Sequence, residues 1–213
     1  MKKKLFLILF ILITLVIIYY IYINISFNNL VNNTINYKDK INYSTYIETS
    51  LKGQNTLKIN YEIIKTSNIK KIILSNYTNN KIENKIEKYI VNNKVYVNDN
   101  GKYKELKDNE EKININYSYL KKSKVKKLNN NTYKIKMKAY DAYNMIYTKD
   151  VMNKKDLDKN IIVIIKKENN FINEISYTIN NLNNNKNNPL KYKIKISNTN
   201  INNHDKLELP FKN

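Results

Sequence analysis

The sequence predicts a mainly β protein, in which an N-terminal transmembrane helix is followed by an antiparallel sheet. Three observations lead to this fold class. An uncharged apolar run lies near the N-terminus, and most of the remaining chain alternates between apolar and polar residues with a period of two. The alternating runs are joined by short Asn-rich links, not by the long crossovers that parallel strands need.

The composition excludes several classes of site. Of 213 residues, 42 are Asn, 38 Lys, 34 Ile and 19 Tyr, a bias typical of an A/T-rich bacterial genome. The chain has no Cys, one His and two Gly. It therefore lacks the residues for a disulfide, a Cys-based zinc site, a multi-His metal site, a P-loop or a dinucleotide-binding loop. We expect no metal and no cofactor.

The N-terminal segment predicts a membrane anchor. Lys2, Lys3 and Lys4 precede residues 5–23, which carry no charge. A helix of that length spans roughly 28 Å, close to the ~30 Å hydrocarbon core of a bilayer. Because positive charges mark the cytoplasmic side, we expect a cytoplasmic tail at 1–4, a single-pass anchor at 5–23 and an extracytoplasmic C-terminal domain in the cell membrane. Three tyrosines near residue 20 suit the interface on the far side.

A cleaved signal peptide is the alternative for this segment. Signal peptides have an apolar region of about 7–15 residues and a cleavage site of small residues. Here the apolar run is longer, and no Ala lies near its end. Residues 24–40 are polar with scattered apolar positions, which predicts a stalk or a short lead-in helix before a β domain at 41–213.

The β domain is predicted to contain ten to twelve strands. The clearest alternating runs are residues 41–51, 57–63, 133–137, 171–179 and 192–196. Such alternation is typical of a sheet with one face on the core and one in water. Residues 161–165 are apolar throughout, which predicts a strand buried on both faces. Asn100 and Gly101 predict a hairpin turn, because both tolerate positive φ.

Two segments predict short helices. In residues 139–150, Tyr140, Tyr143 and Tyr147 have the i, i+3, i+7 spacing of one helix face, beside Met145 and Ile146. Residues 108–120 predict a second helix, although their alternation would also suit a strand.

Four stretches, taken in order, resemble the lipoprotein-carrier-like group of bacterial extracytoplasmic proteins, which includes the LolA-type carriers and the LppX-type proteins. The first, residues 89–106, is a hairpin with an aromatic residue after its turn, and the second is residues 133–148. The third, residues 161–177, is a strand–turn–strand, and the fourth, residues 194–210, is the closing strand with its acidic-aliphatic-Pro tail. Two features depart from the group: a membrane helix replaces the lipobox Cys, and Tyr103 stands where the hairpin usually has Trp.

This resemblance implies a curved, open half-barrel with one or two short helices on its concave side. In the family, the concavity holds acyl chains or other apolar ligands. The helix at 139–150 is then the candidate lid, and Tyr140, Tyr143, Met145, Ile146 and Tyr147 are the expected ligand-binding residues.

The charge of the chain predicts a second kind of contact. Outside the N-terminal tail, 35 Lys and 18 acidic residues give the expected exported part a net charge of about +17. The densest basic run is Lys121, Lys122, Lys124, Lys126 and Lys127. These lysines either contact an anionic lipid or wall polymer, or simply form a solvated sheet face. We expect no nucleic acid as a partner, because Lys lacks the bidentate geometry of Arg.

Catalytic patterns are weak. His204 stands next to Asp205, but adjacent residues on a strand point to opposite faces and would not pair as in a catalytic triad. We therefore expect a non-catalytic, membrane-tethered binding module for an apolar or lipid-like ligand. The alternative is a structural or surface-interaction protein whose core is filled by its own side chains.

Overall fold

The computed structural model describes residues 2–40, 43–52, 56–66, 69–92, 94–106, 115–146, 157–180, 190–199 and 207–210. It has a long N-terminal helix, eleven strands, one 3₁₀ helix and one short α-helix in this part of the chain. The elements are α1 (Lys2–Lys40), β1 (Tyr43–Lys52), β2 (Thr56–Lys65), β3 (Ile69–Thr78), β4 (Lys81–Val91), β5 (Lys94–Asp99), β6 (Lys102–Leu106), η1 (Tyr117–Lys122), β7 (Lys124–Asn129), β8 (Thr132–Lys138), α2 (Ala139–Asn144), β9 (Asn160–Glu168), β10 (Phe171–Ile179) and β11 (Lys191–Thr199).

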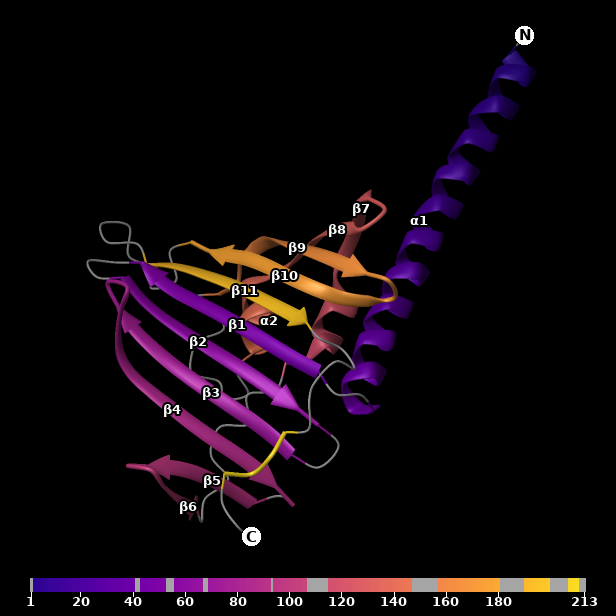
Figure 1. The fold of residues 1–213 in the computed structure, drawn as a ribbon. Coiled ribbons are helices and arrows are strands. Elements are labelled where there is room, and N and C mark those ends of the chain that lie inside the picture. The colour runs from indigo at the N-terminus through magenta and orange to yellow at the C-terminus, as the bar shows by residue number, and fades with distance from the viewer. Residues whose placement is uncertain are drawn as a thin grey trace.

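All eleven strands form one antiparallel sheet in the order β6-β5-β4-β3-β2-β1-β11-β10-β9-β8-β7. Each strand pairs with its neighbour in sequence except where β1 pairs with β11, which joins the two meanders at the centre of the sheet. The sheet is open, with β6 and β7 at its edges, and it curls around the lower part of α1 (Figure 1). The predicted fold class is confirmed.

Asparagine closes the hairpins. The turn after β3 contains Asn79 and Asn80, the turn after β5 contains Asn100, and the turn after β9 contains Asn169. All four residues have φ between 50° and 68°. This left-handed region is costly for most side chains but mild for Asn. Gly101, with φ 84°, completes the predicted turn between β5 and β6. The Asn-rich composition thus serves the short connections of a meander.

The core lies on one face of the sheet, here called the inner face. The inner face is covered by α2, η1 and the second half of α1, which form one continuous apolar cluster with β8 to β11 and parts of β1 to β3. A helix was expected at 139–150, and α2 forms its first part. The helix expected at 108–120 is found only as η1 at 117–122, since residues 108–114 lie outside the described residues. The contribution of α1 was not expected: Ile23, Phe27, Leu30 and Val31 are all buried, and the Phe27 ring packs 5.2 Å from that of Tyr133.

A β-bulge in β10 links α1 to the sheet. The register of β10 against β9 shifts between Ile172 and Glu174, and pairing of β10 with β11 begins only at Glu174, so Ile172 lies beside the bulge and outside the β11 ladder. Its N–H donates to the Thr34 hydroxyl of α1 at 2.9 Å, and its carbonyl accepts from Asn198 Nδ2 of β11 at 2.7 Å. The Thr45 hydroxyl of β1 donates to Asn198 Oδ1 at 2.9 Å. One buried polar network therefore connects α1, β10, β11 and β1.

The first half of α1 is exposed and makes no packing contact with the sheet in the described part of the chain. Large apolar side chains from Phe6 to Tyr22 are about half to three-quarters exposed, between 49% and 72%, whereas Ile23 is 3% exposed. By length and composition, the segment Phe6–Asn36 is apolar enough to cross a membrane, with a mean hydropathy of 2.9 in its best window. The helix continues without a break through residue 23, so the proposed division between anchor, stalk and β domain stays a prediction.

The network around the bulge gives a first prediction. Replacing Asn198 by Leu removes the side-chain donor to the buried carbonyl of Ile172 and breaks the hydrogen bonds of Asn198 with the hydroxyls of Thr45 and Tyr117. Leaving buried polar groups unsatisfied costs about 1–3 kcal/mol of unfolding free energy. Thermal unfolding of the full chain in detergent should show a clearly lower Tm for Asn198→Leu. The control is Asn84→Leu, at an exposed position of β4, which should melt like wild type. Equal Tm values for the two variants would contradict a structural role for the network.

Candidate functional site

The expected ligand-binding residues lie on the inner face, around α2. Tyr140 is half-buried, while Tyr143, Met145 and Ile146 are buried, and Tyr147 lies outside the described residues. The Tyr143 ring packs 6.1 Å from that of Tyr192 on β11. The main chain of this segment is fixed at both ends, since Ala139 N–H donates to Lys159 O and Met145 O accepts from Asn116 N–H, both at 2.8 Å.

Around α2 the inner face is packed. Met145 and Ile146 have exposed fractions of 0% and 1%. A side chain that lined an open cavity would keep accessible surface, so neither residue borders a space that water could enter. A ligand at this position would have to displace α2. Whether Tyr140, Tyr143, Met145 and Ile146 bind a ligand stays a prediction.

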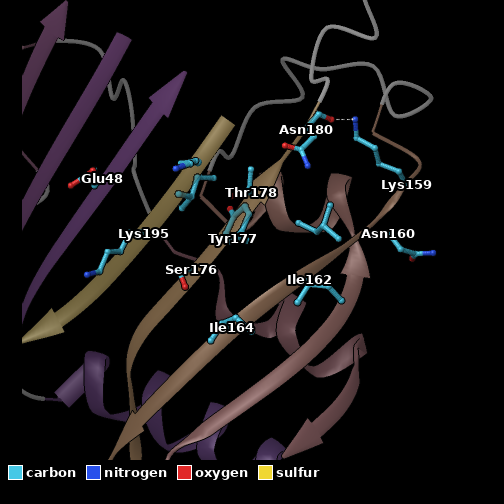
Figure 2. A pocket seen from close by; sticks show the side chains of 13 residues that line it. Glu48, Lys159, Asn160, Ile162, Ile164, Ser176, Tyr177, Thr178, Asn180 and Lys195 are labelled. Carbon is cyan, nitrogen blue, oxygen red and sulfur yellow. Dashed lines mark hydrogen bonds between the residues drawn. The ribbon is translucent and has the colours of Figure 1, made fainter. Parts of the chain in front are cut away.

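A hollow of about 720 Å³ lies on the opposite, outer face of β9, β10 and β11 (Figure 2). We call it the outer groove. Its lining includes Ile162 and Ile164 of β9, Ser176 and Thr178 of β10, and Lys193 and Lys195 of β11. The register places Ile164 opposite Ser176, and Ser176 opposite Lys195. The floor of the groove is therefore a row of residues that runs straight across three strands.

Side-chain size explains the hollow. The β10 positions on the outer face carry the short side chains of Ser176 and Thr178, between the longer Ile and Lys side chains of the neighbouring strands. The prediction that residues 161–165 are buried on both faces was wrong. Ile161, Val163 and Ile165 face the core, but Ile162 is 43% exposed and Ile164 is only half-buried. The apolar run instead supplies the floor of the groove.

The rim of the outer groove is cationic. Lys159, Lys193 and Lys195 surround it, with Glu48 as the one acidic lining residue. Glu48 is already paired with Lys58 at 3.3 Å. Lys193 has no ionic partner among the residues that the structure describes. Burial lowers the pKa of Lys159, whose ammonium donates to the carbonyl of Asn180 at the end of the groove (Figure 2).

Glu174 lies beside the groove and balances part of this charge. Its carboxylate is 2.8 Å from Lys166 Nζ and 3.2 Å from Lys195 Nζ. The hydrogen bond from Lys166, with a further one from Lys195, holds the pKa of Glu174 below its ordinary value against the opposing effect of burial. The carboxylate therefore stays charged at neutral pH, and Lys195 is held in place at the rim.

The predicted basic run is divided by the strand geometry. Lys121 is exposed on η1, and Lys124 and Lys126 are exposed on the outer face of β7, but Lys127 has the parity of buried Val125 and is half-buried. The side chain of Lys122 lies outside the described residues. The contact of this run with an anionic surface stays a prediction.

Cross-strand pairing adds two lysines that sequence reasoning did not include in this set. Lys124 pairs with Lys136, and Lys126 with Lys134, so that four exposed lysines form a block on the outer face of β7 and β8. We call it the lysine quartet. Lys134 and Lys136 in turn lie opposite Ile164 and Ile162. The isoleucine floor of the groove is therefore flanked by lysines on both sides.

The structure offers no metal site among its described residues: no three His, Asp or Glu side chains there are grouped to hold an ion. His204 and Asp205 lie outside the described residues. The expectations of no metal and no catalysis remain predictions.

No known family model matches this sequence, and no curated protein resembles it closely enough to count as a relative. Solved structures do resemble the fold. LprF from Mycobacterium bovis matches with a TM-score of 0.51 over 89% of this chain and 97% of LprF, at 9% sequence identity. The chain has the LprF-like fold. The predicted LolA/LppX-like fold is confirmed, at the level of fold alone.

A LolA superfamily protein from Nitrosomonas europaea also matches, with a TM-score of 0.30 and 5% identity over 83% of this chain and 94% of that protein. The LprF-like fold of this chain thus rests on the first comparison and on the open eleven-stranded sheet with helices on its inner face.

Packing around α2 generates a second prediction. Ile146 is 1% exposed, so Ile146→Lys should bury an unpaired ammonium and lower the unfolding free energy by several kcal/mol, on the order of 3 or more. The matched control is Ile82→Lys, at a position that is 64% exposed on β4. Chemical denaturation of both variants measures the difference. If Ile146→Lys were as stable as Ile82→Lys, α2 would be a mobile lid over a solvent-filled space and not part of the core.

Proposed function

We propose that this protein is a single-pass, membrane-tethered, extracytoplasmic and non-catalytic module that binds an anionic, lipid-like amphiphile in the outer groove. The observation that supports this most directly is the composition of the groove. Exposed Ile162 and half-buried Ile164 form an apolar floor, and lysines stand on both sides of it. An acyl chain would cover the isoleucines while its carboxylate or phosphate meets an ammonium group.

Membrane tethering is the second part of the proposal. It is supported by the exposed apolar half of α1 and by the three N-terminal lysines, which would place the β domain outside the cytoplasm. Because α1 continues into the domain as one helix, the anchor and the sheet would move together. The groove would then face a fixed direction relative to the bilayer.

The inner face is a less favourable location for the ligand. An occupant of that face would compete with Met145, Ile146, Phe27 and Val31, all of which are essentially fully buried. The outer groove needs no rearrangement, because its volume of about 720 Å³ is already open. Pockets of this size, apolar with a few placed polar groups, are typical of small-molecule sites.

The proposal predicts that an acidic residue in the floor abolishes binding. Ile162→Glu should weaken oleate binding at least about tenfold, since the new carboxylate repels the anionic head and removes apolar contact. Lys193→Gln should weaken oleate binding about fivefold, because it removes one charge-assisted hydrogen bond worth roughly 1 kcal/mol. Isothermal titration of the full chain in detergent with a soluble oleate complex measures both.

The control variants carry the same substitutions, Ile to Glu and Lys to Gln, at positions outside the groove. Ile82→Glu alters another exposed isoleucine, on β4, and Lys191→Gln removes a lysine from the same strand as Lys193 without touching the groove. Both should bind oleate like wild type. Wild-type protein that binds no oleate, or variants that all bind equally, would contradict the outer groove as the site.

A second function is favoured by the lysine quartet. Like charges directly opposite on paired strands destabilise a sheet, so four such lysines are better accommodated when a polyanion neutralises them. We propose that the quartet contacts anionic lipid headgroups or a phosphate-bearing wall polymer. Such a contact would be unspecific and sensitive to salt.

Exchanging all four lysines of the quartet for Gln tests this contact. Each lysine near an anionic surface contributes about 1 kcal/mol at most, so the loss of four should weaken binding to phosphatidylglycerol vesicles at least tenfold at low salt. Co-sedimentation with preformed vesicles measures it. The control exchanges Lys81, Lys85, Lys102 and Lys191, which are exposed elsewhere and carry the same total charge. Equal binding by the two quadruple variants, or no effect of salt, would make the quartet an ordinary solvated face.

A further inference from the structure

A second hollow, of about 270 Å³, lies where α1 meets the turn between β9 and β10. In Figure 1 this turn touches the middle of α1. We propose that this hollow binds the phosphate headgroup of one phospholipid from the membrane leaflet next to the β domain. The inference rests on the membrane-tethered part of the proposed function, but not on the outer groove.

Position along α1 is the first argument. The first buried side chain among the described residues of α1 is Ile23, and from there buried and exposed positions alternate around the helix; the hollow begins at Tyr22 and ends at Asn33. At 1.5 Å per residue, these eleven steps span roughly 16 Å along the helix axis. The headgroup layer outside the hydrocarbon core is about 5–8 Å thick on each side. The upper part of the hollow would therefore lie at headgroup depth.

The chemistry of the lining is the second argument. From α1 come Tyr22, Ser26, Asn29 and Asn33, whose spacings of four, three and four residues place them on one face of the helix. The sheet contributes Lys167 and Asn170. Hydroxyl, amide and ammonium groups are all donors to phosphate oxygens. Ile25, Leu30 and Tyr133 complete the lining and would contact the glycerol and the first acyl carbons.

Lys167 is the one cation of the lining. Its main-chain N–H donates to Asn131 O at 2.8 Å, which fixes this part of β9 against the turn before β8. Its side chain has no acidic partner in the part of the chain that the structure describes. Glu168, the next residue, accepts from Asn173 Nδ2 across the turn. Lys166, on the other side, points to the outer face and pairs with Glu174.

The test compares Lys167→Gln with Lys166→Gln. The two variants lose the same charge from adjacent positions of one strand, but only the first alters the hollow. Full-length protein is placed in nanodiscs that contain equal amounts of phosphatidylglycerol and a phosphate-free glucosyl diacylglycerol, and retained lipid is read by native mass spectrometry. Wild type and Lys166→Gln should retain one phosphatidylglycerol in preference to the glycolipid. Lys167→Gln should retain at least about fivefold less, and Asn33→Leu should show a similar loss.

Each other outcome has a definite meaning. Equal retention by Lys167→Gln and Lys166→Gln, or equal retention of both lipids, would overturn the headgroup site while leaving membrane tethering intact. Displacement of the lipid by inorganic phosphate at equal concentration would assign the hollow to a free anion instead. A full chain that does not enter nanodiscs at all would contradict the tethering, and with it this inference. A thermal melt of each variant confirms that any loss of lipid is not a loss of fold.

Discussion

The arrangement of the molecule depends on how two backbone groups of Ile172 are satisfied. Ile172 lies beside the bulge in β10 and before the first β10–β11 pair, and a buried backbone group without a partner is costly. Thr34 accepts the N–H and Asn198 donates to the carbonyl, at 2.9 Å and 2.7 Å. These two hydrogen bonds tie this end of β10 to α1 and to β11. Phe27, Leu30 and Val31 then fill the adjacent inner face.

This constraint determines which surfaces remain available. In an open half-barrel, the concave face offers the largest apolar area for a ligand. Here the second half of α1 and the α2 segment occupy the described part of that face around β8 to β11, and the side chains there are close to fully buried. The same helix that would hold the protein in a membrane thus completes its core. The outer face of the sheet, with its small β10 side chains and its lysines, is left as the surface open to partners.

The sequence was sufficient for the fold class and for several connections, because these follow from local rules. Alternation with a period of two identified the strands, and the Asn-rich links became turns with positive φ. The role of Thr34 and Asn198 could not be predicted, since each is one polar residue in a chain rich in them. Their importance arises only when the bulge brings α1 and β11 to the same residue. The extent of α1 was also underestimated, because its apolar positions after residue 23 are scattered among Asn residues.

The candidate sites, too, could be predicted from the sequence only in part. Residues 161–165 were the only strand predicted to be buried on both faces, and that prediction was wrong because alternate isoleucines form the floor of an open groove and not a second buried layer. The basic run was recognised on one strand, but the lysine quartet exists only through the register of β7 with β8. Periodicity assigns a residue to a face of its own strand, whereas a binding surface is built across strands. The lysines that flank the isoleucine floor are 26 to 33 residues away from it in sequence, and only the pairing of β8, β9, β10 and β11 brings them together.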